Sequence, residues 1–167
     1  MSPARHDPHL ALRTLDRHGV AFVLIGGLAG RAAGSPSITN DTDVCYARDR
    51  PNLERLAAAL IELQARLRGV DEDVPFILDA KTLEAGQNFT FETTAGALDV
   101  LAEPAGTRGY DDLAANATPA DLGDGLLVHI CSLDDLIRMK RAAGRPKDRI
   151  ELEVLAAVRE ESERTDR

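Results

Sequence analysis

Short apolar runs alternate with segments of helical period along the chain, which predicts a mixture of buried strands and amphipathic helices. Glycines end the apolar run "VAFVLIGG", and "DTDVCYA" reads as a second strand. Two further runs, "QNFTFETT" and "GALDVLAE", predict a hairpin that turns at Ala95-Gly96. The expected strands are therefore 20–27, 41–47, 87–94, 96–103 and 125–131, and the run "VPFILD", 74–79, is compatible with another.

Helix signals separate these strands. Asp7-Pro8 can begin a helix with Leu10, Leu12 and Leu15 on one face, and residues 51–69 form a strongly amphipathic pattern between Pro51 and Gly69. A short helix is expected at 28–34. Ser132 with Asp135 three residues later predicts the cap of a helix that ends near Gly144, and a final helix begins near Pro146 and runs into a polar tail, 160–167, expected to fray.

These elements predict a mixed α/β (α+β) fold, in which helices pack on a mixed β-sheet. The length of 167 residues suits a single domain covering residues 1–167. The strands near 20–26, 42–47 and 97–102 are expected to be neighbours in the sheet. No internal repeat interrupts the pattern.

Composition favours a cytoplasmic protein with no membrane association. Apolar residues make up 44% of the chain, but no apolar run approaches membrane-spanning length, and the first ten residues lack the apolar stretch of a secretory signal. The two cysteines, Cys45 and Cys131, are too few and too far apart for a disulfide scaffold or a zinc motif. Both are expected to behave as small core residues.

The charge is unevenly distributed. A net charge of −8 argues against a general nucleic-acid coat protein. Residues 138–149, however, carry six basic residues against the single acid Asp148. Such a block is a candidate anion site, although a solvated helix face would have the same composition. Lys140 is the best phosphate candidate because it borders the apolar face of its helix, and Arg145 and Lys147 flank Pro146 in a tight loop.

Two aspartates stand inside the predicted strand 41–47. Asp41 and Asp43 are one residue apart, so in a strand they point to the same face with Cα atoms roughly 6–7 Å apart. Asp99 interrupts another apolar strand in the same way. Converging carboxylates repel one another unless a cation lies between them, and Mg²⁺ sites use such oxygens together with substrate phosphates. Alternatively, Asn40-Asp41 belongs to a turn and backbone donors hold the acids.

A glycine pair precedes these acids. Gly26 and Gly27 end a strand and open the short helix, which allows the backbone to approach a phosphate closely. The sequence there is neither a G-x-G-x-x-G fingerprint nor a P-loop. By itself the pair is compatible with an ordinary turn.

The combination of motifs resembles the nucleotidyltransferase superfamily of DNA polymerase β type. Its pattern is an apolar residue, Gly, then Gly or Ser, a short spacer, Asp-x-Asp or Asp-x-Glu, and later a third acid. Here thirteen residues separate Gly27 from Asp41, and Asp99 in "ALDVL" matches the third acid. The tail "SLDDLIRMKRAAGRPKD" is similar to that of small bacterial nucleotidyltransferases of the abortive-infection and toxin–antitoxin type. Gly27 departs from the many relatives that have Ser there.

This resemblance implies a nucleotidyltransferase-like fold and a metal-dependent transfer of a nucleoside monophosphate from a nucleoside triphosphate to an acceptor hydroxyl. Asp41, Asp43 and Asp99 would be catalytic residues and ligands of Mg²⁺ or Mn²⁺, with Asp99 either a ligand or a general base. The cofactor-binding candidates, which would hold a nucleotide such as ATP, are Gly26, Gly27, Lys140, Arg145 and Lys147.

The partner and the acceptor stay open on the sequence alone. A protein side chain, a tRNA end or a small hydroxylated molecule such as an antibiotic would each serve as acceptor, and the resemblance leaves room for a toxin or antitoxin partner and for a homodimer. The alternative function is a non-catalytic antitoxin or partner-binding module with the same fold. A metal-stabilised fold without transfer activity is a further alternative.

Overall fold

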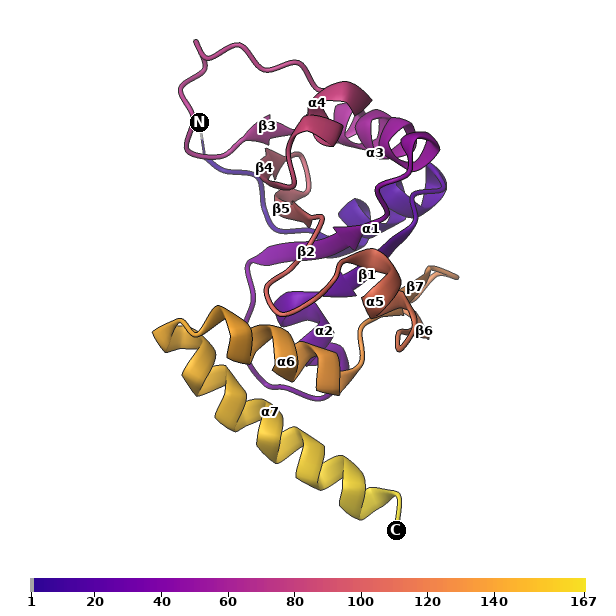
Figure 1. The fold of residues 1–167 in the computed structure, drawn as a ribbon, viewed down its shortest axis with the longest axis vertical. Helices are drawn as coiled ribbons and strands as arrows, with labels where there is room; N and C mark the ends of the chain where they lie inside the picture. The colour runs from indigo at the N-terminus through magenta and orange to yellow at the C-terminus, as the bar shows by residue number, and fades with distance from the viewer. Residues whose placement is uncertain (1) are drawn as a thin grey trace.

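The computed structural model describes residues 2–167 and places a seven-stranded mixed sheet between helices (Figure 1). The strand order is β3-β4-β5-β2-β1-β7-β6. The strands are β1 Phe22–Ile25, β2 Asp41–Tyr46, β3 Arg66–Leu67, β4 Asn88–Thr93, β5 Gly96–Leu101, β6 Thr118–Asp121 and β7 Leu127–Ile130. The helices are α1 Pro8–Arg17, α2 Gly26–Ala32, α3 Arg50–Glu62, α4 Ala80–Ala85, α5 Tyr110–Ala114, α6 Leu133–Ala143 and α7 Pro146–Thr165.

The three central strands are the ones that the sequence predicted to be neighbours. Strand β2 pairs with β1 in antiparallel and with β5 in parallel orientation. Helices α1 and α3 lie on one side of these strands and α2 and α6 on the other, while α7 extends away from the sheet (Figure 1). Buried side chains from both layers, among them Leu15, Leu56, Val44 and Leu136, form the core. The mixed α/β prediction is confirmed.

Helix α3 ends earlier than predicted. The amphipathic pattern predicted a helix to Gly69, but α3 stops at Glu62. Gln64 adopts a positive φ of 52°, and the N–H groups of Gln64 and Ala65 donate to Ile61 and Leu60. These bonds form a Schellman motif, which closes a helix when its C′ residue is left-handed. Because the chain turns here, residues 66–67 become the edge strand β3.

Other parts of the middle of the chain differ from the expectation. Residues 74–79 form no strand, and Val74 and Ile77 are exposed. The following segment is helix α4, which begins where the Asp79 carboxylate accepts from the N–H of Thr82. Helix α5 and strand β6 were not predicted at all. Pro119 in β6 cannot donate to a sheet ladder, which is acceptable because β6 is an edge strand.

Several helices begin where the capping residues in the sequence predicted. Asp7 caps α1, and the Ser132 hydroxyl accepts from the N–H of Asp135 at the start of α6, as predicted. Helix α7 begins at Pro146, and the tail expected to fray is helical up to Thr165. Among the described residues, none of the helices combines the length and the apolar character that crossing a membrane requires.

Candidate functional site

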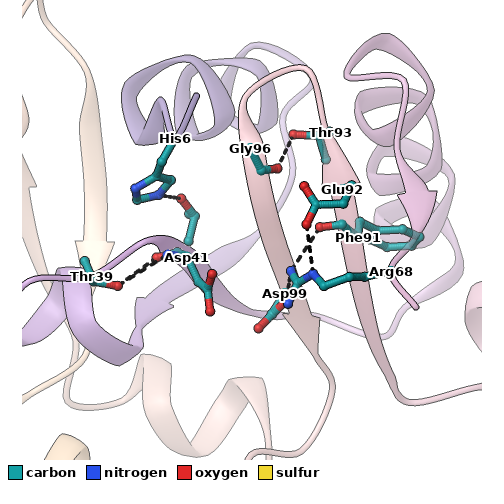
Figure 2. A network of polar contacts seen from close by, with 10 residues as sticks. His6, Thr39, Asp41, Arg68, Phe91, Glu92, Thr93, Gly96 and Asp99 are labelled. Carbon is teal, nitrogen blue, oxygen red and sulfur yellow. Dashed lines mark hydrogen bonds and ion pairs between the residues drawn. The ribbon is translucent and has the colours of Figure 1, made fainter. Parts of the chain in front are cut away.

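The parallel pairing of β2 and β5 brings two of the predicted acids side by side. Asp43 is the register partner of Asp99, and Asp41 lies opposite Ala97. The carboxylates of Asp41 and Asp99 point to the same side of the sheet (Figure 2). The side chain of Asp99 is only 17% exposed. The carboxylates that the sequence proposed as a group are therefore neighbours in space.

The environment of Asp43 disfavours its charge. Burial, the charge of Asp99, a hydrogen bond with Asp99 and the charge of Asp41 together raise the pKa of Asp43 to about 7. The positive charge of Lys140 acts in the opposite direction. A buried carboxylate next to other carboxylates gains stability from a cation. Asp43 is therefore the acid most in need of a positively charged ligand.

The glycine pair lies directly against these acids. Gly26 has a φ of +69°, and a Cβ atom there would lie 2.1 Å from Asp43 Oδ2. A Cβ atom on Gly27 would lie 2.7 Å from Thr39 Cβ and 2.8 Å from its hydroxyl oxygen. Neither position has room for a side chain, so the turn between β1 and α2 needs both glycines. The absence of Ser at position 27 follows from the position of Thr39.

Thr39 also determines how Asp41 is held. Its hydroxyl donates to the carbonyl oxygen of Asp41 (3.1 Å) and accepts from the N–H of Asp41 (3.4 Å), as Figure 2 shows. Asp41 is the first residue of β2. Asp41 therefore belongs to the strand, and Thr39 in the preceding loop fixes its backbone. Sequence reasoning missed Thr39, although its place two residues before Asp41 is typical of a side chain that bonds to a nearby backbone.

Arg68 is a second residue at this site that sequence reasoning missed. Its Nη2 donates to Asp99 Oδ1 at 2.9 Å and to the carbonyl oxygen of Phe91 at 3.1 Å (Figure 2). Its Nε lies 3.1 Å from Glu92 Oε1. The sequence predicted Arg68 within a helix over 51–69, and nothing in that prediction placed its side chain near Asp99. Only the early end of α3 places it on the sheet.

The N-terminal segment covers the other side of β2. His6 Nε2 lies 3.0 Å from the hydroxyl of Thr42, between the two acids of the strand, and the N–H of Asp7 donates to Ala95. Gly96 allows this approach, because a Cβ atom there would lie 2.9 Å from His6 Cα. His6 thus contacts β2 on the face opposite to the carboxylates of Asp41 and Asp43.

The basic candidates Lys140 and Arg145 converge on Asp148, whose side chain is completely buried. Arg145 Nε donates to Asp148 at 2.7 Å, its backbone N–H donates at 3.1 Å, and Lys140 Nζ donates at 3.4 Å. Burial raises the pKa of Asp148, but the hydrogen bonds from Arg145 and the charges of Lys140 and Arg145 lower it below its ordinary value. This arrangement is the basic corner between α6 and α7.

The basic corner is close enough to influence the acids. Lys140 lowers the pKa of Asp43. The pKa of Arg145 is raised mainly by its hydrogen bond with Asp148, and the charge of Asp43 adds to this. Lys147 is exposed and has no ion pair within residues 2–167, so the structure does not bring it to the acids. Arg138, from the same basic block, pairs with Asp112 and Asp135 instead.

The donor chemistry fits a hard divalent cation. Asp41 and Asp43 offer carboxylate oxygens of the kind that Mg²⁺ and Mn²⁺ prefer, and Gly26 keeps the space beside Asp43 free of side chains. Within the described part of the chain, however, no three acids, histidines or cysteines are arranged so that together they could hold a metal ion. A cation would therefore depend on two carboxylates and on ligands from a substrate.

The comparisons with known proteins bear on the fold. No protein-family model matches the chain, and no curated protein sequence matches it. Among solved structures, the solution structure of the antibiotic-resistance factor ANT(2'')-Ia has a TM-score of 0.55 at 18% identity over 89% of this chain and 80% of that one. The crystal structure of ANT(2'')-Ia in complex with adenylyl-2''-tobramycin has a TM-score of 0.55 at 17% identity, over 89% and 85%. The chain has the nucleotidyltransferase-like fold of these structures.

Proposed function

We propose that the chain is a metal-dependent nucleotidyltransferase that moves a nucleoside monophosphate from a nucleoside triphosphate to an acceptor hydroxyl. One observation carries this proposal: Asp43 and Asp99 are register partners on parallel strands, and the glycine turn leaves no room for a side chain beside Asp43. The fold shared with ANT(2'')-Ia, one structure of which holds adenylyl-2''-tobramycin, supports it.

In this reaction the acceptor oxygen forms a bond to the α-phosphorus, the bond from that phosphorus to the bridging oxygen breaks, and pyrophosphate leaves. The proton of the acceptor hydroxyl passes to Asp99, the general base. Asp41 and Asp43 would hold a divalent cation, Mg²⁺ or Mn²⁺, which would supply positive charge for the triphosphate. The backbone at Gly26 and Gly27 approaches the phosphates.

The basic corner is the second part of the proposed nucleotide site. Lys140 lies within electrostatic range of Asp43, so a phosphate chain between them would meet a positive charge on the side opposite the cation. Arg145 and Lys147 border the same corner and are exposed. Asp148 holds Arg145 in place, and Lys147 would have to approach from solvent.

The finer parts of the proposal come from the sequence resemblance. We expect a small bacterial enzyme of the abortive-infection or toxin–antitoxin type, a single cytoplasmic domain that uses ATP or another triphosphate. The acceptor is a protein side chain, a tRNA end or a small hydroxylated molecule. The aminoglycoside in the ANT(2'')-Ia complex supports the last of these. A homodimer or a partner protein is compatible with the exposed outer half of α7.

The existing ion pairs favour one alternative function. Arg68 already binds Asp99, and Asp148 already binds Lys140 and Arg145. A non-catalytic antitoxin or partner-binding module would keep such pairs permanently. This alternative predicts that triphosphate and metal do not change the unfolding midpoint and that no acceptor is labelled.

The first experiment measures thermal unfolding and label transfer on the full chain. Mg²⁺ or Mn²⁺ together with a triphosphate should raise the unfolding midpoint more than either alone, because metal removes carboxylate repulsion and triphosphate completes its ligands. Incubation with each α-³²P nucleotide and separate tRNA, aminoglycoside and protein acceptors should label one acceptor class. A midpoint indifferent to every combination, with no labelled acceptor, would contradict the proposal and favour the non-catalytic module.

A further inference from the structure

Arg68 is fixed at the site from two strands. Its backbone N–H donates to the carbonyl oxygen of Thr90 at 2.9 Å, which ties β3 to β4. Its guanidinium contacts the Phe91 carbonyl and the Glu92 carboxylate on β4 and the Asp99 carboxylate on β5. The guanidinium therefore has a defined position on the β4 side of Asp99 (Figure 2).

The charge of this group is permanent. An arginine side chain does not lose its proton in proteins, and its planar fork is less strongly hydrated than an ammonium group, so it suits a partly buried carboxylate. Asp99 Oδ1 accepts from Arg68 Nη2, and Asp43 is the register partner of Asp99 on the other flanking strand, β2. A cation bound to Asp99 Oδ1 would lie directly beside the guanidinium, which makes this oxygen a poor cation ligand.

A divalent cation shared by all three carboxylates would lie close to the fixed guanidinium. Like charges at such short range repel strongly where water is largely excluded, and Asp99 is mostly buried. In agreement with this, the described residues contain no three acidic, histidine or cysteine side chains arranged around a common ion position. Asp41 and Asp43 lie on the opposite side of Asp99 from Arg68, because β2 and β4 flank β5.

We infer that the Arg68 guanidinium occupies the position beside Asp99 where a second divalent cation would otherwise bind, so that the chain binds a single divalent cation, on Asp41 and Asp43. This inference rests on the proposed function and assigns Arg68 as a positioning residue. It holds Asp99 beside the acceptor, where the carboxylate receives the proton of the hydroxyl. The nucleotide then brings its metal ion to the β2 side of the site, and no second ion is needed next to Asp99.

The test counts bound Mn²⁺ on the full chain by electron paramagnetic resonance, with and without a non-hydrolysable α,β-methylene triphosphate. The wild-type protein should bind one Mn²⁺ per chain in the presence of the analogue. Arg68→Met should bind two, because it opens the second position. Arg66→Met is the matched control: Arg66 lies in β3 two residues before Arg68, pairs with Glu72 at 3.4 Å and is well exposed, so its loss should leave the count at one.

Arg68→Lys separates charge from geometry and should also bind one ion, because it keeps the positive charge. Two Mn²⁺ on the wild-type chain, or one on a folded Arg68→Met variant, would overturn the inference while leaving the proposed function intact. If Arg68→Met does not fold, the number of Mn²⁺ ions bound by the wild type and by Arg68→Lys still tests the inference, because two ions on either would contradict it. Absence of bound Mn²⁺ in every variant would instead contradict the proposed function, and with it the role of Arg68.

Discussion

Two aspartates in this molecule, the buried Asp148 and the partly buried Asp43, have opposite environments. Asp148, in the basic corner, is completely buried and accepts from Arg145 and Lys140, and its pKa is below the ordinary value. Asp43, between β1 and β5, lies among other carboxylates and has a pKa raised to about 7. The first is already neutralised by its own chain. The charge of Asp43 is offset only by the more distant Lys140, as expected for a residue that binds a positively charged ligand.

The comparison explains why burial alone is a poor guide to function. Asp148 connects the start of α7 to α6, since it accepts from the backbone N–H of Arg145 and from the Lys140 ammonium. Within residues 2–167, Asp43 makes no comparable set of contacts with cations. A structural acid and a candidate catalytic acid differ here in what surrounds them, and substitutions at the two positions should therefore have opposite effects.

Replacement of Asp43 by Asn gives the largest expected effect. Transfer of label should fall at least about 100-fold, because the carboxylate charge that holds the cation is lost. Without metal, the unfolding midpoint should stay the same or rise, since one negative charge leaves a repelling cluster. The measurements are label transfer from α-³²P nucleotides and thermal unfolding of the same preparation. Full labelling with a lower midpoint would mean that Asp43 is structural.

Asp148→Asn is the counterpart of that substitution. It removes the buried partner of two cations and should lower the free energy of unfolding by about 3 kcal/mol. Thermal unfolding of the two variants side by side checks this. If the midpoint of Asp148→Asn is unchanged while that of Asp43→Asn falls, the contrast between the two regions is wrong.

The glycine turn should be the next most sensitive position. Gly26→Ala puts a Cβ atom against Asp43 at a φ of +69° and should cost about 2–4 kcal/mol of unfolding free energy, together with loss of metal-induced stabilisation. Gly69→Ala is the control, since Gly69 has a similar φ of +73° but a Cβ atom there would meet no other atom within 4 Å. It should cost only about 1 kcal/mol.

Equal losses in the two glycine variants, measured by urea unfolding, would mean that only backbone conformation matters at Gly26. In that case the closeness of the turn to Asp43 has no energetic consequence. A larger loss of unfolding free energy in Gly26→Ala than in Gly69→Ala, which added metal does not restore, would support the assignment of the glycine turn to the site.

The most gradual expected effect is on the pH dependence of stability, because it is spread over several pH values. The folded-state pKa of Asp43, about 7, lies above its unfolded value near 4, so the unfolded chain binds fewer protons in between and stability without metal should fall as pH rises from about 4 to 7. For Asp148 the pKa is lowered, so its contribution should be lost as pH falls below about 4. Urea unfolding at several pH values should show Asp43→Asn flattening the first trend and Asp148→Asn the second.

Much of the site could be predicted from local sequence. The period-2 pattern places Asp41 and Asp43 on one face of a strand, and Asp99 interrupts an equally clear apolar run. Capping residues such as Ser132 act on N–H groups two or three residues away, so their partners are also visible in the sequence. Interactions of this range need no knowledge of the fold.

Only the tertiary structure determined which charges meet. Arg68 lies 31 residues before Asp99, and its contact depends on α3 ending at Glu62 and on β3 pairing with β4. The amphipathic pattern continued to Gly69, and only a left-handed Gln64, which has no distinctive sequence signal, interrupts it. Apolar periodicity determines which residues are buried, but the partner of a buried charge depends on strand order and register, which arise from packing of the whole sheet.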